Sequence, residues 1–300
     1  MRFEPLSPKG GVAVSGIDLS QPLIPAVSNQ LRDAFEEHGL LVIRGQKLTK
    51  QQLVAATEPF GGPDLSPPAE NCDPDVPGVS EIRTRGPNGE IIHEDDDALL
   101  GETGWHTDHA YIPKPNRGKL LYAVEVPEER GGTGFIDGFA TYAALSGEMK
   151  ERIEGLHVIQ SWNHAQATIN KNKAYRDKGE TMLADNRFAD MAYPLVVTHP
   201  HSGRKALNCP PLWAAGIVEL PGAEGKALVA ELIEHLTGEE FVYWHRYRPG
   251  DIAAWDNWRY IHSAEGTPGR CVRRLWSVVV QGGPVIGREI GRRETEMAGA

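Results

Sequence analysis

Cysteine is scarce in this chain: its 300 residues include three, Cys72, Cys209 and Cys271. The number is odd and no two of them have the CxxC spacing, which excludes a disulfide framework and a cysteine zinc site. Long apolar runs are missing too. The longest purely aliphatic stretches, residues 40–43 and 278–280, fall far short of the roughly 18 residues that a membrane-spanning helix needs. The N-terminus carries no apolar signal segment, so we expect a soluble protein of the reducing cytoplasm.

Positive charge is in deficit. Lysine and arginine number 31 against 41 aspartate and glutamate residues, a formal net charge of -10. A chain with this balance has no basic field to hold a phosphate backbone or an anionic membrane surface. We therefore expect neither nucleic acid nor a membrane as a partner.

Glycine and proline are plentiful, at 33 and 22 residues, which is typical of many turns joining short strands. Strand-like segments follow one another at residues 11–18, 40–44, 120–126, 135–137, 156–161, 195–199, 205–208, 241–248, 251–255 and 271–280. Helical periodicity is confined to residues 27–35, 139–153, 223–236 and a short segment after the capping box of Thr49 and Gln52. The pattern predicts a mostly β protein with flanking helices, a sandwich or jelly roll rather than a parallel α/β sheet.

The chain has no internal repeat and no linker at which it divides. We therefore predict a single domain over residues 1–300. Two segments are polar and irregular: residues 62–102, rich in proline, aspartate and asparagine, and residues 162–192. Loops of this length are uncommon in compact domains and are often lids, so we predict that both segments are lids.

His106 and Asp108 are the first residues at which residue type and spacing both suggest chemistry. On a strand, positions two apart face the same side, so they would present an imidazole and a carboxylate together, two ligands of a 2-His-1-carboxylate iron site. The spacing alone is weak evidence for a metal site, because a second pair with the same spacing exists, His93 and Asp95. That pair lies in an acidic run where nothing would exclude water. His106, in contrast, follows Trp105 and precedes other aromatic and apolar residues.

The third ligand must come from another strand, and His262 is the best candidate. Arg273 lies eleven residues beyond it, with Arg274 next. An arginine near a metal offers a two-pronged donor to a carboxylate, so a dicarboxylate co-substrate would chelate the iron at one end and meet the guanidinium at the other. The alternative interpretation is that the histidines and Asp108 are satisfied polar residues of a β core.

These residues belong to a longer pattern. The chain resembles the taurine dioxygenase and 2,4-dichlorophenoxyacetate dioxygenase family of Fe(II)- and 2-oxoglutarate-dependent oxygenases over nearly its whole length. The similar segments are, in order, PLSPKGGVAVSGIDLS, HGLLVIRGQKLT, WHTDHAY, LLYAVEVPEERGG, THPHSGRKALN, PGDIAAWDNWRYIHSA and the arginine pair. The resemblance implies a double-stranded β-helix, the cupin-like jelly roll. It also implies His106, Asp108 and His262 as metal ligands, with Trp255 beside the metal site.

The resemblance further implies an arginine for the distal carboxylate of 2-oxoglutarate. We prefer Arg273, which needs no gap after His262, and Arg274 is the alternative. In the family a threonine after a glycine pair usually helps the arginine to bind that carboxylate, and here it would be Thr133. The family typically has an acidic residue between the glycines and the threonine, whereas Thr133 follows Gly132 directly; the match is therefore shifted.

A second departure concerns the substrate. Members that act on sulfonates or aryloxy acids typically have another arginine four positions beyond the first. That position is Ser277 counted from Arg273 and Val278 counted from Arg274, and neither side chain is charged. The substrate is then held by hydrogen bonds and apolar contacts, or by a charge from a lid residue that the sequence does not identify.

The function implied by the resemblance is that of a non-haem iron dioxygenase, an oxidoreductase. It would use Fe(II), 2-oxoglutarate and O2 to oxidise, most simply to hydroxylate, a small organic metabolite with release of succinate and CO2. Two other hypotheses remain: a zinc or manganese hydrolase or isomerase on a cupin-like barrel, and a metal-free binding protein. The hydrolase or isomerase gives no reason for an arginine on the strand after His262, whereas the fold permits a binding protein. Relatives commonly form dimers or tetramers, so we expect a homo-oligomer.

Overall fold

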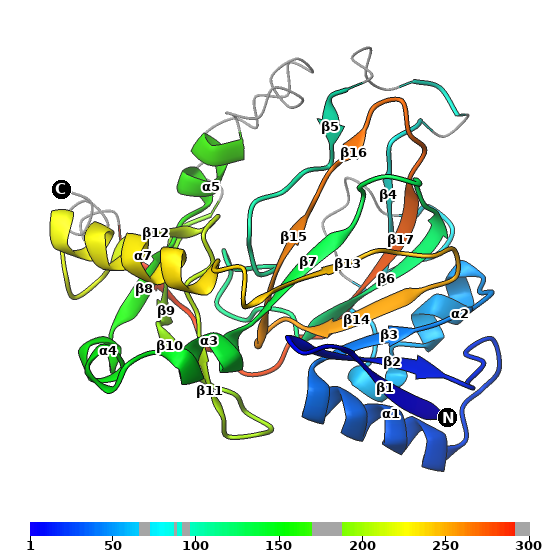
Figure 1. Ribbon diagram of the computed structural model, residues 1–300, viewed down its shortest axis with the longest axis horizontal. Helices are drawn as coiled ribbons and strands as arrows, with labels where there is room; N and C mark the ends of the chain where they lie inside the picture. The colour runs from blue at the N-terminus through cyan, green and yellow to red at the C-terminus, as the bar shows by residue number, and fades with distance from the viewer. Residues whose placement is uncertain (66–72, 87–88, 92–96, 170–187, 292–300) are drawn as a thin grey trace.

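The computed structural model describes residues 1–65, 73–86, 89–91, 97–169 and 188–291 (Figure 1). The helices of these ranges are α1 (Pro25–His38), α2 (Lys50–Ala55), the 3-10 helix η1 (Glu58–Phe60), α3 (Gly138–Ala144), α4 (Gly147–Ile153), α5 (Trp162–Ile169) and α7 (Ala223–Leu236). The strands are β1 (Arg2–Ser7), β2 (Gly10–Ser15), β3 (Leu40–Ile43), β4 (Val79–Arg83), β5 (Leu99–Leu100), β6 (Gly118–Glu125), β7 (Thr133–Asp137), β8 (His157–Gln160), β9 (Asp190–Pro194), β10 (Val196–Thr198), β11 (Lys205–Leu207), β12 (Ala214–Ile217), β13 (Val242–His245), β14 (Ile252–Asp256), β15 (Tyr260–Ala264), β16 (Thr267–Pro268), β17 (Arg274–Val280) and β18 (Arg288–Ile290). The protein is mostly β with flanking helices, as the strand spacing predicts.

Two sheets face each other at the centre of the molecule. The larger has the order β1-β2-β3-β14-β6-β17-β4 and the smaller the order β13-β7-β15; Figure 1 shows the smaller sheet beside β14 and β6. Leu121 and Trp255 of the large sheet pack with Phe135 of the small one in a single apolar cluster. Their inner faces therefore form one core, as in a jelly roll.

The outer face of the large sheet is covered by α1. Leu31 and Phe35 of this helix pack against Val14 and Leu41 of the sheet, and the helix ends at Gly39, whose φ of 67° is left-handed and whose N–H donates to the Phe35 carbonyl at 2.8 Å. The helix and the buried strand β3 are confirmed predictions. The capping box that opens α2 is confirmed as well.

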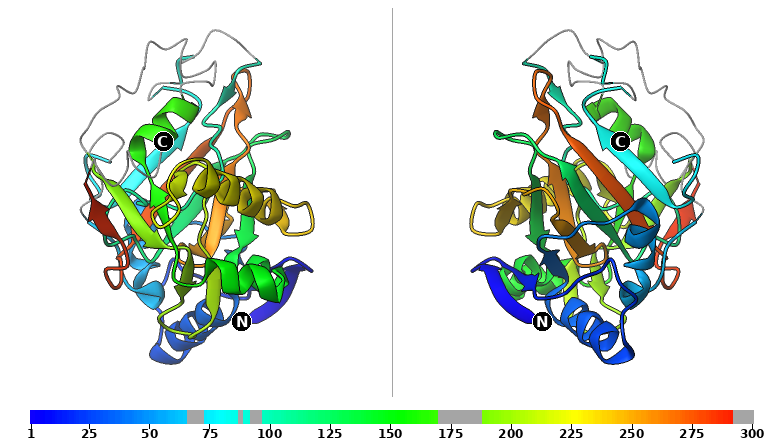
Figure 2. Two further views of the ribbon diagram at one scale, coloured as in Figure 1. Left: turned by 90° about the vertical axis from the view of Figure 1, so that its left-hand side faces the viewer. Right: turned by 90° about the vertical axis from the view of Figure 1, so that its right-hand side faces the viewer.

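The outer face of the small sheet packs into an apolar cluster that also includes residues of α7 and of the four-stranded sheet β12-β8-β9-β18. Because side chains alternate along a strand, Ile136 of β7 and Ile261 of β15 face outward, and they pack with Leu228 and Leu232 of α7. The left view of Figure 2 shows α7, in yellow, crossing in front of the strands. The prediction of a helix at residues 223–236 is confirmed.

Two local predictions were wrong, and one strand was missing from the strand-like segments. The helical segment 139–153 is two helices, because Ser146 caps α4 by accepting from the Met149 N–H and so interrupts the run. Residues 260–264 form β15, the other strand that the third ligand requires, which the strand-like segments did not include. Residues 105–108 are not a strand: His106 makes an isolated bridge and Asp108 begins a turn.

The predicted lid segments lie partly outside the described residues. Within the described parts, residues 162–169 form α5 where the sequence suggested irregular chain, and β4 and β5 fall inside the segment 62–102. None of the helices in the described ranges combines the length and the apolar character needed to cross a bilayer.

Candidate metal centre and its surroundings

His106, Asp108 and His262 converge beside β15, the strand of the small sheet that carries His262. His106 and His262 exchange two backbone hydrogen bonds, each of 2.8 Å, across an isolated antiparallel bridge. Asp108 follows in the turn. One ligand atom from each of the three side chains lies within 4.8 Å of the other two, the only such group of histidine, cysteine and acidic residues in the described ranges. Two segments about 150 residues apart are thereby fixed face to face.

The histidines present free nitrogens to the carboxylate. The Nε2 atoms of His106 and His262 lie 3.8 and 3.7 Å from the Asp108 oxygens. The Nδ1 atom of His106 lies 2.7 Å from the Gly104 carbonyl; since a carbonyl only accepts, Nδ1 carries the proton and Nε2 keeps its lone pair. Such outer hydrogen bonds orient histidine ligands in metal sites.

Burial sets the charge of each group. It lowers the pKa of both histidines, for His262 to well below the ordinary value, so both rings are neutral at pH 7. Burial alone would raise the pKa of Asp108, but the charge of Lys119 holds it well below its usual range. Two neutral imidazoles and one carboxylate are the donor set of a divalent transition metal. The residues therefore fit Fe(II).

Asn257 holds the backbone of the metal-ligand turn, a role that sequence reasoning did not assign. Its Oδ1 accepts from the Asp108 N–H at 2.8 Å, and its Nδ2 donates to the Asp108 carbonyl at 2.9 Å. Asn257 precedes β15, which carries His262. One amide side chain thus ties the turn of one ligand to the strand of another.

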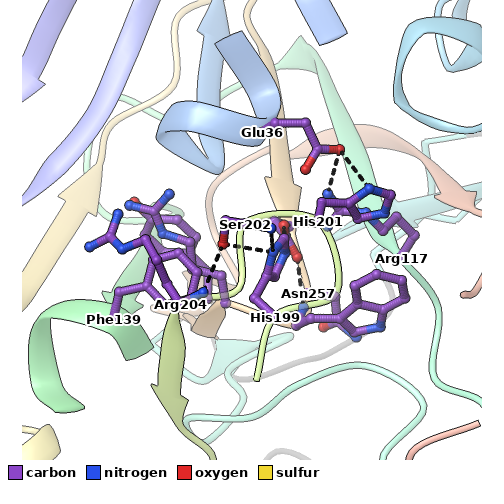
Figure 3. A network of polar contacts seen from close by, with 12 residues as sticks. Glu36, Arg117, Phe139, His199, His201, Ser202, Arg204 and Asn257 are labelled. Atoms are coloured by element: carbon purple, nitrogen blue, oxygen red, sulfur yellow. Dashed lines mark hydrogen bonds and ion pairs between the residues drawn. The ribbon is translucent and has the colours of Figure 1, made fainter. Parts of the chain in front are cut away.

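A buried polar network fixes the loop that carries Asn257. Asp256 forms ion pairs with Arg117 and with His199, whose Nε2 lies 2.8 Å from the carboxylate. Figure 3 shows His199 beside Ser202, and Glu36 between Arg117 and His201. The His199 side chain is 1% exposed, although the polar residues that follow it are typical of a surface turn. Its partner Asp256 lies far away in the chain, which a local pattern does not reveal.

We predict that Asn257→Ala weakens metal binding about 10-fold without unfolding the protein. The variant loses both bonds to the Asp108 backbone, and loss of an outer partner of a metal ligand typically costs about 10- to 100-fold in affinity. Titration with Co(II), followed by its visible absorption, measures the change. His201→Ala, at the exposed edge of the same network, is the matched control. Equal affinity in the two variants would contradict the role of Asn257.

Arg273 and Arg274 point in opposite directions. Arg273 is buried, and its Nε donates to the Gly131 carbonyl at 3.0 Å. Among the described residues no carboxylate forms an ion pair with it, although burial lowers its pKa and so opposes its charge. Arg274 lies on the other face of the strand, half-exposed, with its Nε 2.6 Å from the Glu81 carboxylate. Arg273 is therefore the arginine of this pair that makes no ion-pair contact with a carboxylate in the described ranges.

A pair of buried hydroxyl groups lies near Arg273. The Thr133 hydroxyl lies 3.1 Å from the Tyr247 hydroxyl, and Tyr247 is close enough to Arg273 for the guanidinium charge to act on its hydroxyl group. The buried Thr267 hydroxyl has no hydrogen-bond partner in the described part of the chain. Thr133 pairs with Ala264, two residues beyond His262 on β15, so these donors lie one step along the strand from the metal ligands. The set fits a carboxylate.

Trp255 forms one wall of the site. Its ring centroid lies 4.8 Å from that of His262, and its side chain is fully buried. A second aromatic cluster adjoins the Asp108 turn: the Tyr111 ring contacts Trp162 at 4.7 Å and Phe188 at 4.5 Å, while the Trp213 indole donates to the Thr107 carbonyl. These rings exclude water around the turn.

His109 does not join the ligand group. On an alternating strand it would face away from Asp108, but it lies in the turn with a φ of 58°, so alternation does not apply there. Left-handed backbone is uncommon for a residue with a side chain and often marks a functional site.

Residues 2–279 match the family described as "Taurine catabolism dioxygenase TauD, TfdA family". The chain is 31% identical over 264 residues to the alpha-ketoglutarate-dependent 2,4-dichlorophenoxyacetate dioxygenase of Cupriavidus pinatubonensis, which covers 86% of this chain and 90% of that protein. It is 30% identical over 293 residues to the (S)-phenoxypropionate/alpha-ketoglutarate-dioxygenase of Sphingobium herbicidovorans, with 93% and 94% covered. The crystal structure of AAD-2 in complex with Mn(II) and N-oxalylglycine superimposes with a TM-score of 0.79 at 28% identity, covering 95% of this chain and 100% of that one. The chain therefore belongs to the TauD/TfdA family and is an Fe(II)- and 2-oxoglutarate-dependent dioxygenase that acts on a small organic molecule.

Proposed function

We propose that His106, Asp108 and His262 hold the iron of this dioxygenase and that Arg273 binds the distal carboxylate of 2-oxoglutarate. The observation that carries the proposal is the pairing of two incomplete groups: three ligand atoms within 4.8 Å of one another, and a buried guanidinium without an ion-pair partner among the described residues. A 2-oxo diacid has a chelating end for the first group and a carboxylate for the second.

Each residue of the chain then has a defined task. Bound Fe(II) supplies the redox chemistry that couples the conversion of 2-oxoglutarate and O2 into succinate and CO2 to oxidation of the substrate. Arg273, with the hydroxyls of Thr133 and Tyr247, orients the co-substrate. Trp255 keeps water from the site beside His262. The default oxidation is hydroxylation of a C–H bond.

Anaerobic addition of Fe(II) and 2-oxoglutarate tests the proposal. A 2-oxo acid chelated to ferrous iron gives a visible charge-transfer band, so we expect a coloured complex in the wild-type protein. His106→Ala and His262→Ala should lose the band while far-UV circular dichroism stays unchanged. An undiminished band in either variant would reject that residue as a ligand.

The hydrolase or isomerase interpretation receives no support from the relatives, which are named as dioxygenases. It also gives the buried Arg273 no anion to bind. The band experiment separates the two, since a hydrolase has no need of 2-oxoglutarate.

We further propose a single oxygenase domain over residues 1–300, with segments 62–102 and 162–192 acting as lids, and a homo-oligomer, a dimer or tetramer, in the cytoplasm. Size-exclusion chromatography with light scattering tests the assembly state. The net charge of -10 supports a partner that is neither nucleic acid nor an anionic membrane.

A further inference from the structure

Lys119 is a charged residue beside the metal ligands that the proposed function leaves without a task. It lies on β6, where it pairs with Trp255 on one side and Val279 on the other. It shares the inner face of the sheet with Leu121, because positions two apart on a strand face the same side. Its Nζ is 3.1 Å from Asp108 Oδ2 and 3.3 Å from Oδ1. Within the described ranges this carboxylate is its only ion-pair partner.

Lys119 and Ser277 are diagonal neighbours on the paired strands β6 and β17. Ser277 pairs with Leu121 across β17 and β6, which makes Lys119 its diagonal neighbour on the same face, about 7–8 Å away between Cα atoms. Ser277 is buried and lies four positions beyond Arg273, the place of the second arginine in relatives that act on sulfonates or aryloxy acids. An extended lysine side chain spans that separation. The positive charge missing from position 277 is therefore present on the neighbouring strand.

Once Fe(II) and 2-oxoglutarate are bound as proposed, no anion of the site remains to balance the charge of the Lys119 ammonium. Two positive charges of Fe(II) and one of Arg273 balance the Asp108 carboxylate and the two carboxylates of 2-oxoglutarate. The Lys119 charge is then in excess, in a partly buried site where its interaction with an anion is poorly screened by salt. Its side chain is 19% exposed, so a substrate entering from solvent can contact it.

We propose that Lys119 binds the anionic group of the substrate, which makes the substrate class an organic monoanion such as a carboxylate or sulfonate. This inference rests on the proposed function. It replaces both alternatives left open by the sequence, binding by hydrogen bonds and apolar contacts alone or by a charge from a lid residue: the charge comes from the sheet itself. The aromatic cluster around Tyr111, next to the Asp108 turn, suits probes with an aromatic body.

Binding to the anaerobic Fe(II)/2-oxoglutarate complex tests the inference without turnover. Three probes of similar size are titrated while the charge-transfer band is followed: phenoxyacetate and benzenesulfonate as anions, and 2-phenoxyethanol as the neutral counterpart. We expect at least one anion to bind more tightly than the neutral probe, as measured by the concentration at which it perturbs the band. Lys119→Met should weaken that anion about 10- to 100-fold, the usual effect of losing a charge-assisted hydrogen bond, and leave 2-phenoxyethanol unchanged. Lys119→Arg should retain most of the affinity.

Two further variants make the result decisive. Lys50→Met is the matched control, because Lys50 also forms an ion pair with a carboxylate and its side chain is 20% exposed; it should bind all probes as the wild type does. Lys119→Ala combined with Ser277→Arg should regain anion binding by moving the charge to the neighbouring strand. The inference is wrong if no anion perturbs the wild-type band, or if Lys119→Met weakens Fe(II) and 2-oxoglutarate binding but leaves the preference for anions intact, since Lys119 would then only position Asp108. Failure of the wild-type band to form at all would instead overturn the proposed function together with this inference.

Discussion

Asp108→Ala should abolish substrate-coupled succinate formation, with a loss of at least about 100-fold. Removing an outer partner of a metal ligand already costs about 10- to 100-fold in affinity or activity, and Asp108 is proposed as a ligand itself. Its two oxygens face the Nε2 atoms of His106 and His262 at 3.8 and 3.7 Å, and among the described residues no other carboxylate joins this group. Succinate release at saturating Fe(II) and 2-oxoglutarate measures the effect.

The same substitution has a second consequence, on stability. It leaves the partly buried Lys119 ammonium, 19% exposed, without its carboxylate. A fully buried unpaired group costs about 1–3 kcal/mol, so we expect a loss at the lower end of that range. Urea denaturation of the metal-free protein should therefore give a lower free energy of unfolding for Asp108→Ala than for the wild type. Adding Lys119→Met to Asp108→Ala should recover most of that loss without restoring activity. Recovery of turnover in the double variant, or unchanged turnover in Asp108→Ala, would refute the ligand assignment.

The sequence predicts the parts of this fold that depend on local patterns. Leu31 and Phe35 recur at helical spacing, Gly39 supplies the left-handed end of α1, and Thr49 and Gln52 form a capping box. Each of these features is encoded within a few neighbouring residues, and each is found in the structure. The split of residues 139–153 into two helices was missed, because hydrophobic periodicity continues across Ser146 although its side chain starts a new helix.

Convergence of the candidate site depends on pairing between distant strands, which periodicity does not determine. The sequence analysis placed His106 and Asp108 on one strand, because alternate strand residues face the same side. In the structure an isolated bridge joins His106 to His262, and a turn brings Asp108 to them. The register of β17 decides which of the two adjacent arginines faces inward. In the structure Arg273 is the buried one.

Lys119 was missed for a similar reason. The apolar run on which the strand was predicted begins at Leu120, whereas β6 begins at Gly118. A lysine at the end of an apolar segment is usually a solvated flank. Only the pairing with Trp255 and Val279 places it on the inner face, beside Asp108. The resemblance to a family predicts what most members share, and a charge moved from one strand to the next lies outside that pattern.

Arg273→Met should weaken 2-oxoglutarate binding about 100- to 1,000-fold while leaving Fe(II) binding within a few-fold of the wild type. A guanidinium offers two parallel hydrogen bonds to a carboxylate, and charge-assisted hydrogen bonds contribute about 1.5–3 kcal/mol each. Methionine fills much of the same volume without the charge, so the loss reports binding rather than a cavity. Titration of the charge-transfer band with 2-oxoglutarate gives the dissociation constant, and Arg273→Lys, which keeps the charge but not the two-pronged geometry, should lie between the two.

Arg274→Met is the control that the chain itself provides, one residue away on the opposite face. Its side chain is 41% exposed and its partner is Glu81, and an ion pair of this kind is worth about 0–1 kcal/mol. We therefore expect its dissociation constant for 2-oxoglutarate to stay within about 3-fold of the wild type. The reverse order of effects, a large loss in Arg274→Met and a small one in Arg273→Met, would transfer the co-substrate carboxylate to the outer face of β17. That result would be incompatible with a site built between the two sheets, because the guanidinium of Arg274 and the metal ligands would then lie on opposite sides of the same strand.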